Sequence, residues 1–203
     1  AAAKAGADAV KLQTMDADRN YVTGTESYDV FKGTELSMEE TASMFVLAKS
    51  LGLEVFTTLG DFNTADWINE LDPCAWKISS GLLTHLPLIE YLAKLKRPLL
   101  MSTGLSNLKE IDEAVHKARA AGNDQIGIFQ CTSLYPASID EINISSIMSL
   151  YDRFSVPVGF SDHTLGTDAA FLAVGAGAKM IEKHFTFDST RKGFDHGISL
   201  DPD

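Results

Sequence analysis

Seven short apolar runs recur along the chain, separated by stretches of mixed polarity. They cover residues 8–13, 53–58, 75–79, 98–102, 126–131, 156–160 and 179–185. Each run has the length of a β-strand. Within most runs the apolar residues follow one another directly, rather than at every second position, which is typical of strands buried on both faces. The pattern therefore predicts seven strands of one buried sheet.

Helical periodicity fills the intervals between these runs. A capping box of Ser37 and Glu40 begins one helix, which ends at Gly52. We expect the core-facing side of this helix to carry Met44, Leu47, Ala48 and Leu51. Similar signals predict further helices over 63–72, 86–95, 107–122, 144–154 and 167–176, the first capped by Asn63 and the third by Asn107 with Glu110.

Strands that alternate with helices imply a parallel sheet. The strands recur at intervals of roughly 22 to 28 residues over most of the chain, which fits a TIM (β/α)8 barrel of about 250 residues. We therefore predict an α/β fold, with residues 1–203 as a single partial barrel domain that lacks the first strand and the last helix. An open doubly wound sheet is the rival, but no Gly-x-Gly-x-x-Gly follows the first strand.

Residues 14–34 lack periodicity and are rich in Asp, Thr, Gly and Tyr. Loops of this length without regular structure are usually either functional or disordered. Two interpretations stay open for this segment. It is either a lid over the site at the first strand or an unstructured excursion.

The chain has 203 residues and a formal net charge of −11, which argues against nucleic acid or an anionic membrane as its partner. Its two cysteines, Cys74 and Cys131, lie in or beside apolar runs. We expect them to be reduced and buried, as in a cytoplasmic protein. No segment is long and apolar enough to span a bilayer, and no signal peptide is visible.

Almost every predicted strand ends in polar side chains, at the edge where parallel α/β folds place their active sites. Lys11 and Lys77 are the sharpest of these signals, because each interrupts an apolar run. A buried lysine without an anion is costly. The two lysines therefore predict a bound phosphate or carboxylate, with a structural ion pair as the alternative. Nearby serines and threonines would add directional hydrogen bonds.

His163 and His184 end two neighbouring predicted strands. With Asp162 and Glu182 beside them, they predict a divalent metal site. Imidazole and oxygen ligands are compatible with Mn, Fe, Co or Zn. Two hydrogen-bonded core histidines are the alternative interpretation.

The remaining histidines carry weaker signals. His85 and His116 fall in helical patterns and are expected at the surface, while the role of His196 in the last loop stays open. Tyr135, just past a strand end, and Asp195, in the last loop, are candidates for binding a sugar or polyol, although Tyr135 with the following proline is also a plain turn.

An ordered set of motifs extends over essentially the whole chain. It comprises VKLQ (10–13), KISSG (77–81), MSTG (101–104), QCTSLYP (130–136), GFSDHT (159–164), IEKHFT (181–186) and GFDH (193–196). No single motif is decisive, but the ordered set resembles the N-acetylneuraminate (sialic acid) synthase family. The resemblance implies a (β/α)8 barrel transferase that condenses phosphoenolpyruvate with an N-acylated hexosamine, typically N-acetylmannosamine. The products would be a nonulosonic acid and phosphate.

Carried onto this sequence, the resemblance implies roles for residues at almost every strand end. His163 and His184 would bind Mn²⁺, with Mg²⁺ or Co²⁺ as alternatives, and would act in catalysis together with Lys11, Lys77 and Glu182. Phosphoenolpyruvate would be bound by Lys11, Thr58, Lys77, Ser80, Ser102, Ser133, Ser161 and Glu182. The amino sugar would be bound by Gln13, Tyr135 and Asp195. The resemblance also implies a homodimer.

Three features depart from the family pattern. Leu82 stands where the family generally has a carboxylate that touches the sugar, which leaves the identity of the amino sugar open. The family's first strand, with its sugar-binding glutamate, and its C-terminal antifreeze-like domain are absent from residues 1–203. The alternative is a non-catalytic barrel that binds a sugar acid or serves as an assembly module. Barrels that condense phosphoenolpyruvate with sugar phosphates are a further rival, disfavoured because the arginines are scattered along the chain.

Overall fold

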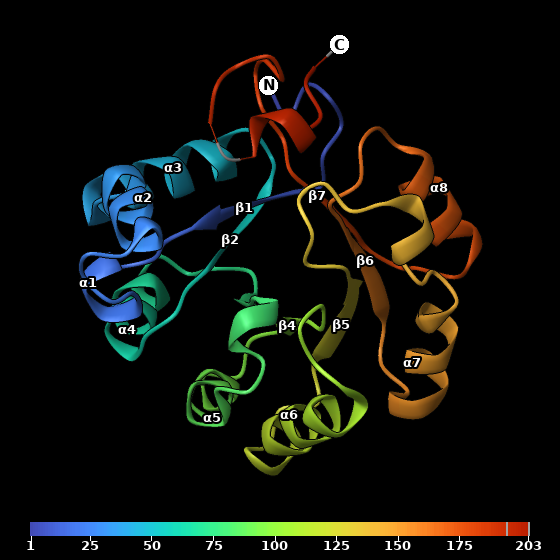
Figure 1. The fold of residues 1–203 in the computed structure, drawn as a ribbon. Coiled ribbons are helices and arrows are strands. Elements are labelled where there is room, and N and C mark those ends of the chain that lie inside the picture. Colours follow the sequence, from blue (N-terminus) through green and yellow to red (C-terminus); the bar gives the residue numbers. More distant parts are fainter. Residues whose placement is uncertain (194, 203) are drawn as a thin grey trace.

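The computed structural model describes residues 1–193 and 195–202, and the described residues form one seven-stranded sheet (Figure 1). All neighbouring strands are parallel, and they lie side by side in the order in which they occur along the chain. The strands are β1 (Ala9–Gln13), β2 (Glu54–Thr58), β3 (Trp76–Ile78), β4 (Leu99–Ser102), β5 (Ile126–Cys131), β6 (Val158–Asp162) and β7 (Ile181–Lys183). Each coincides with a predicted apolar run, so the predicted α/β fold with a parallel sheet is confirmed.

Helices lie around the outside of this sheet and join its strands (Figure 1). They are α1 (Ala17–Asn20), α2 (Glu26–Thr34), α3 (Met38–Ser50), α4 (Phe62–Glu70), α5 (Leu86–Lys94), α6 (Leu108–Ala120), α7 (Ser146–Phe154) and α8 (Asp168–Gly175). Single 3-10 turns occur at η1 (Ser80–Leu82), η2 (Ile139–Glu141) and η3 (His196–Ile198). The capping boxes predicted for α3 and α6 are both formed. No helix of the described part of the chain could cross a membrane.

The sheet curls until its two edge strands face one another. In a flat sheet, β1 and β7 would be separated by six strand intervals, or roughly 29 Å. Instead, the ammonium group of Lys11 on β1 lies 3.1 Å from the carboxylate of Glu182 on β7. Since β1 and β7 are not hydrogen-bonded to each other in the described structure, the sheet is a curled, incompletely closed barrel.

The core fills the space between the sheet and the helices, and the central strands are its most buried part. Every residue of β3 and β5 is buried, whereas β1 and β7 are only partly covered. The expected core face of α3 is confirmed only at Ala48 and is wrong at Met44, Leu47 and Leu51. Thr41, Phe45 and Ala48 are buried there, while Met44 and Leu47 are 40% and 59% exposed.

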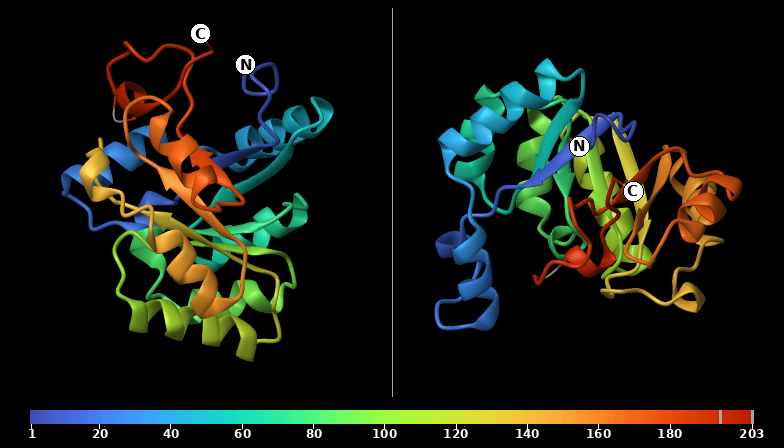
Figure 2. Two further views of the ribbon diagram at one scale, coloured as in Figure 1. Left: turned by 90° about the vertical axis from the view of Figure 1, so that its right-hand side faces the viewer. Right: turned by 90° about the horizontal axis from the view of Figure 1, so that it is seen from above.

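Three local expectations also need correction. The cap of α4 is Asp61, whose carboxylate accepts a hydrogen bond from the Thr64 amide at 3.0 Å, and not Asn63. His85 is a half-buried N-cap of α5 rather than a surface residue of a helix. The lack of regular structure expected over 14–34 is wrong, because this segment forms α1 and α2. In the view from above, these two helices and η3 lie on the same side of the sheet (Figure 2).

Candidate active site

A cavity of about 350 Å³ opens at the carboxyl ends of the strands. It is lined by all the residues for which a site role was predicted except Asp162 and Asp195: Lys11, Gln13, Thr58, Lys77, Ser80, Ser102, Ser133, Tyr135, Ser161, His163, Glu182 and His184. These residues come from all seven strands or the loops that follow them. The curl of the sheet therefore brings together side chains that are up to 173 positions apart in the sequence.

The two predicted lysines converge on one carboxylate at the floor of this cavity. Lys11 lies 3.1 Å from one oxygen of Glu182, and Lys77 lies 3.4 Å from the other. Lys77 also donates a hydrogen bond to the Ser102 hydroxyl at 2.6 Å, and its ammonium group lies 5.4 Å from the centre of the Phe129 ring. The side chain of Lys77 is only 2% exposed.

Burial and charge act in opposite directions on these groups. Burial lowers the pKa of Lys77 to about 8, although the Glu182 carboxylate opposes this change and Lys11 adds to it. Burial alone would raise the pKa of Glu182, but Lys77, Lys11 and the Ser161 hydroxyl outweigh it and lower the pKa to about 2. Glu182 is therefore ionised at neutral pH, and the two lysines share one negative charge. An anion that enters the cavity meets a net positive site.

Hydroxyl groups surround these charges. Ser161 donates a hydrogen bond to Glu182 at 2.9 Å, and Ser80 accepts one from the Gly104 amide at 3.0 Å. The Thr58 hydroxyl is buried and has no hydrogen-bond partner among the described residues. A buried hydroxyl without a partner is costly, so its place on the cavity wall indicates that a polar ligand completes the site.

His163 and His184 face one another across the cavity mouth, with their ring centroids 5.6 Å apart. Two imidazoles that share one ion have centroids roughly 5 to 6 Å apart, given metal–nitrogen distances of about 2.1 Å. The Nδ1 atom of His163 lies 2.8 Å from the Thr132 carbonyl, which can only accept, so Nδ1 carries the proton and Nε2 has the free lone pair. This is the usual outer hydrogen bond of a metal-ligating histidine.

The surroundings of His184 fit the same role. Its Nδ1 atom lies 3.6 Å from a carboxylate oxygen of Asp195, and burial lowers its pKa, which favours the neutral imidazole that binds metals. Among the described residues, no group of three or more His, Cys, Asp or Glu side chains is arranged to hold an ion. The two histidines therefore fit a site at which water or substrate supplies the other ligands.

The structure changes the interpretation of the two aspartates. Asp162, predicted to lie near a metal, is fully committed elsewhere: one carboxylate oxygen accepts hydrogen bonds from Thr164, and the other pairs with Lys183 at 3.0 Å. Asp195, predicted to bind the sugar, is not part of the cavity wall and instead lies behind His184.

Leu82, the residue that departs from the family pattern, packs against the hydrophobic core and is not part of the cavity wall. The replacement of the family's carboxylate by Leu82 therefore removes a carboxylate from the site, but it does not place an apolar side chain there.

Cys131 and Tyr135 add to the surroundings of His163. The Cys131 sulfur, which also lines the cavity, lies 3.9 Å from its Nδ1 atom. Burial would raise the pKa of this thiol and lower that of the imidazole, but the contact between them outweighs burial in both cases. The Tyr135 ring packs on the other side, 4.1 Å from the His163 ring. From the sequence, Cys131 was predicted only to be buried. Its position at the edge of the cavity was not recognised, because the residue belongs to an apolar run.

Sequence reasoning missed an apolar part of the cavity wall. Met15, Tyr21, Phe31 and Leu105 also line the cavity, and the first three belong to the segment whose structure was not predicted. Three aromatic residues, Tyr21, Tyr28 and Phe31, in a largely polar segment were the available signal. Polar strand ends and an apolar outer wall thus meet in one cavity.

A curled parallel sheet with cationic and imidazole groups at its carboxyl ends defines the class of this protein, an α/β protein with a barrel-like sheet. The particular family follows from comparison: the model of the NeuB family matches residues 1–203, and the chain belongs to this family. The chain is similar to an uncharacterized protein of Methanocaldococcus jannaschii (40% identity over 100% of this chain and 60% of the relative). It is also similar to the N,N'-diacetyllegionaminic acid synthase of Legionella pneumophila (39% identity, 100% and 62%).

Solved structures agree with this assignment. The sialic acid synthetase of Leptospira borgpetersenii, solved in complex with citrate, superposes with a TM-score of 0.95 at 29% identity. The match covers 99% of this chain and 70% of that protein. The chain thus spans about 60% of the length of the curated relatives named above.

Proposed function

We propose that this chain forms the catalytic core of a synthase that condenses phosphoenolpyruvate with an N-acylated amino sugar. The products would be a nonulosonic acid and phosphate. The NeuB family assignment supports this proposal, as do relatives named synthases of legionaminic and sialic acids. In the proposal, the curled sheet is the main part of a TIM (β/α)8 barrel.

One observation carries the proposal: Lys11 and Lys77, from two strands separated by β2, converge beside the unpartnered Thr58 hydroxyl in one cavity. Two ammonium groups and several hydroxyls match the phosphate and carboxylate of phosphoenolpyruvate. Lys11 and Lys77 are also the only Lys or Arg side chains among the described residues of the cavity wall. Since both serve one anion, the proposed sugar carries no phosphate of its own.

The residues of the chain would act mainly by binding and orientation. Lys11 and Lys77 would neutralise the anion, and the serines would fix its orientation by hydrogen bonds. The carbon of the enol CH₂ group would then lie against the aldehyde carbon of the open-chain sugar. The π electrons of the enol form a bond to the aldehyde carbon, whose oxygen takes up a proton and becomes a hydroxyl. Water then adds to the oxocarbenium-like carbon that carried the enol phosphate and loses a proton. Phosphate leaves with cleavage of the carbon–oxygen bond, and the 2-keto acid remains. Ionised Glu182 would hold both ammonium groups in place before the anion enters.

A divalent ion, Mn²⁺ in our proposal, would be held by the Nε2 atoms of His163 and His184. When bound, such an ion would supply a Lewis acid for the sugar aldehyde. The hydrogen bond of His163 to Thr132 and the contact of His184 with Asp195 would orient the two rings toward it. A homodimer and a cytoplasmic location remain predictions from the resemblance and from the two free cysteines.

The test is phosphate release from phosphoenolpyruvate by the protein that carries this chain, with N-acetylmannosamine and Mn²⁺. We expect turnover that EDTA abolishes and that Lys77→Met reduces by roughly 100-fold, because this variant removes one partner of a buried charge pair. His184→Ala should lose Mn²⁺ binding, whereas His116→Ala, which alters an exposed histidine on α6, should not. Absence of turnover with every N-acyl hexosamine, together with absence of Mn²⁺ binding, would support the non-catalytic alternative.

A further inference from the structure

The segment between β1 and α3 folds over one side of the cavity. We call residues 15–35 the cap; they include α1 and α2. Within the cap, the rings of Tyr21 and Phe31 stack in parallel, with centroids 4.4 Å apart and an interplanar angle of 13°. Both rings are half-buried, and both line the cavity together with Met15. The stacked pair is therefore one apolar surface that faces the cavity.

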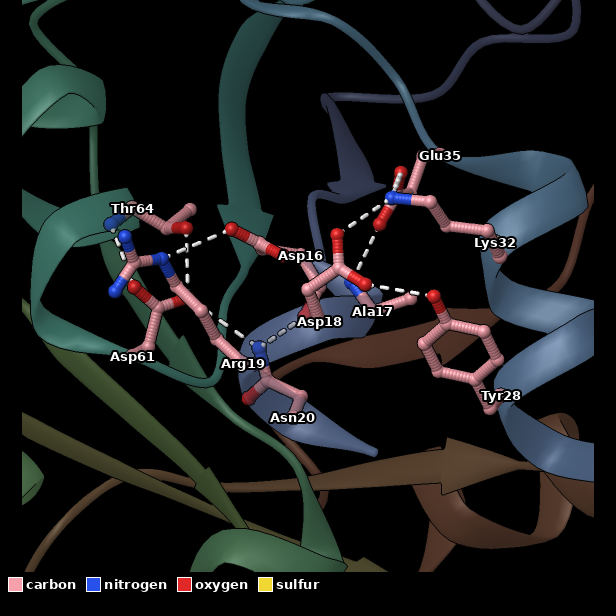
Figure 3. A network of polar contacts seen from close by, with 10 residues as sticks. All are labelled: Asp16, Ala17, Asp18, Arg19, Asn20, Tyr28, Lys32, Glu35, Asp61 and Thr64. Atoms are coloured by element: carbon pink, nitrogen blue, oxygen red, sulfur yellow. Dashed lines mark hydrogen bonds and ion pairs between the residues drawn. The ribbon is translucent and has the colours of Figure 1, made fainter. Parts of the chain in front are cut away.

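A polar network holds the two cap helices together (Figure 3). Lys32 on α2 pairs with Asp18 on α1 at 2.9 Å and with Glu35 at 3.0 Å. Asp18 also accepts a hydrogen bond from the Tyr28 hydroxyl at 2.6 Å, and Glu35 accepts one from the Ala17 amide. Asp18 and Lys32 are exposed and Glu35 is half-buried, so each ion pair is weak on its own. Together they favour the one arrangement of α1 and α2 in which Tyr21 meets Phe31.

The cap also packs closely against the turn between β2 and α4. Asn20 donates hydrogen bonds to the Asp16 carbonyl at 2.8 Å and to the Asp61 carboxylate at 3.3 Å (Figure 3). A Cβ atom added to Gly60 would lie 1.9 Å from the side-chain oxygen of Asn20 and 2.8 Å from the methyl carbon of Met15. A side chain at position 60 would therefore displace the Asn20 amide and the Met15 methyl group from these positions, and their docking determines where the aromatic pair lies.

The chemistry of this wall differs from that of the cavity floor. Lys11, Lys77 and the serines at the strand ends suit an anion, whereas Tyr21 and Phe31 offer aromatic surface. Ring faces favour methyl groups and sugar C–H groups, which lose contact with water there. A hexose can place only its C–H groups against such a wall. An acylamino group adds a methyl, so an N-acylated sugar buries more apolar surface there.

Taking the proposed function as its basis, we propose that Tyr21 and Phe31 are specificity-determining residues that bind the acylamino group of the sugar. The pair would distinguish an N-acyl hexosamine from the parent hexose. The cap residues would leave the binding of phosphoenolpyruvate unaffected, because its two cations lie on β1 and β3. Gly60 and Asn20 would act as positioning residues, through the docking of the cap.

The experiment compares Tyr21→Ala, Phe31→Ala and Gly60→Ala with wild type and with a matched control, Val22→Ala. Val22 adjoins Tyr21 but is 75% exposed. Titration calorimetry gives the Kd for phosphoenolpyruvate alone, and then, with phosphoenolpyruvate bound, for N-acetylmannosamine and for mannose. We expect the Kd for N-acetylmannosamine to rise roughly 10- to 100-fold in the three variants, the range found for lost apolar contacts in a pocket. The Kd for phosphoenolpyruvate should not change, and Val22→Ala should match wild type.

Phosphate release on the same samples separates this inference from the proposed function. If wild type turns over N-acetylmannosamine and the three variants keep its preference over mannose, the aromatic pair is not the specificity wall. If the variants lose sugar binding while wild type binds the sugar without turnover, the wall is supported and the proposed function is wrong. Wild-type protein that binds phosphoenolpyruvate but neither sugar would overturn the wall. Loss of phosphoenolpyruvate binding in the variants would also overturn the proposed role of the aromatic pair. The cap would then be needed for the structure of the whole cavity and not for sugar binding in particular.

Discussion

A lysine with almost no exposed surface is the feature that best connects the sequence of this protein to its chemistry. A buried ammonium group that is not hydrated needs anionic partners. Lys77 shares a single carboxylate, that of Glu182, with Lys11. Burial lowers its pKa to about 8, against the opposing effect of Glu182. The site therefore keeps a net positive charge in the absence of ligand, and in our proposal this charge binds the substrate anion.

The affinity for phosphoenolpyruvate should consequently fall as the pH rises above about 8. Lys77 is protonated below this pH and becomes neutral above it, so the cavity loses one positive charge. The other titratable groups that face Lys77 are Glu182, Lys11 and Cys131. Glu182 stays ionised throughout this range because its pKa is about 2. Calorimetry between pH 7 and 9.5 should show the Kd rising by up to about tenfold per pH unit above the pKa.

Two variants identify the group responsible for this fall. Cys131→Ser should keep it, because the thiol is not its source. Lys77→Met should bind weakly at every pH and should lack it. A Kd that stays constant to pH 9.5 in the wild-type protein would show that Lys77 does not supply charge to the anion.

Gly104 is a second residue whose identity the site requires. A Cβ atom at this position would lie 2.5 Å from the Ser133 hydroxyl and 3.0 Å from the Ser80 hydroxyl. Gly104→Ala should displace both hydroxyls and raise the KM for phosphoenolpyruvate by roughly tenfold, equivalent to the loss of one or two hydrogen bonds. Gly175→Ala is the matched control, because no atom lies within 4 Å of the added carbon. Equal KM values for the two variants would contradict the close packing around Gly104.

At the scale of elements, the sequence identified every strand because the local signal and the global fold agree. A parallel strand buried on both faces is a continuous apolar run, and helices separate the runs at regular intervals. The capping boxes of α3 and α6 were equally readable, since Ser37 and Asn107 each bond their own first turn. The polar residues at the strand ends could be recognised for the same reason, because no packing argument explains them.

The sequence could not settle which side of α3 faces the sheet. Met44, Leu47 and Leu51 form one apolar stripe of this helix, but Phe45 with Ala48 forms another. When a helix is apolar on most sides, periodicity does not select the buried face. The cap was missed for a different reason: contacts such as that of Asn20 with Asp61 join residues 41 positions apart, which no local pattern reveals.

The ends of β6 and β7 depend on a buried ion pair, and its loss should be costly. The side chain of Asp162 is 0% exposed and that of Lys183 is 9% exposed, at a separation of 3.0 Å. Lys183→Met leaves the buried carboxylate without its cation, so we expect a loss of about 3–5 kcal/mol in the free energy of unfolding. Urea denaturation measures this change.

Two further variants test the electrostatic origin of that loss. The double variant Lys183→Met with Asp162→Asn should recover part of the stability, because the unpaired charge is gone. Lys94→Met breaks an exposed ion pair with Glu90 on α5 and should have no measurable effect. A Lys183→Met variant as stable as Lys94→Met would show that the pair is not needed to hold the two strands that carry the histidines.

At the scale of the whole molecule, the open curl of the sheet determines how a ligand acts on stability. The protein carries a net charge of −11, so its overall field does not attract anions. Attraction is local, and it requires groups from β1, β3 and β7 to be in place at once. Strands β3 and β5 are buried throughout, while the edge strands β1 and β7 are only partly covered. The site is therefore assembled from the most stable and the least stable parts of the sheet.

Amide hydrogen exchange should reveal this arrangement. Without ligand, β1 and β7 should exchange faster than β3 to β5, because edge strands open locally. Phosphoenolpyruvate at 100 times its Kd should slow exchange in β1 and β7 by up to about 100-fold, since opening of either edge destroys the site. Lys11→Met removes the contact from β1, so it should lose the slowing in β1 and keep part of it in β7. In the contrary outcome, phosphoenolpyruvate slows exchange in the central strands but not in β1 or β7. This result would show that the anion is held by the centre of the sheet alone. The ion pair of Lys11 and Glu182 would then connect the edge strands β1 and β7 without contributing to the binding of phosphoenolpyruvate.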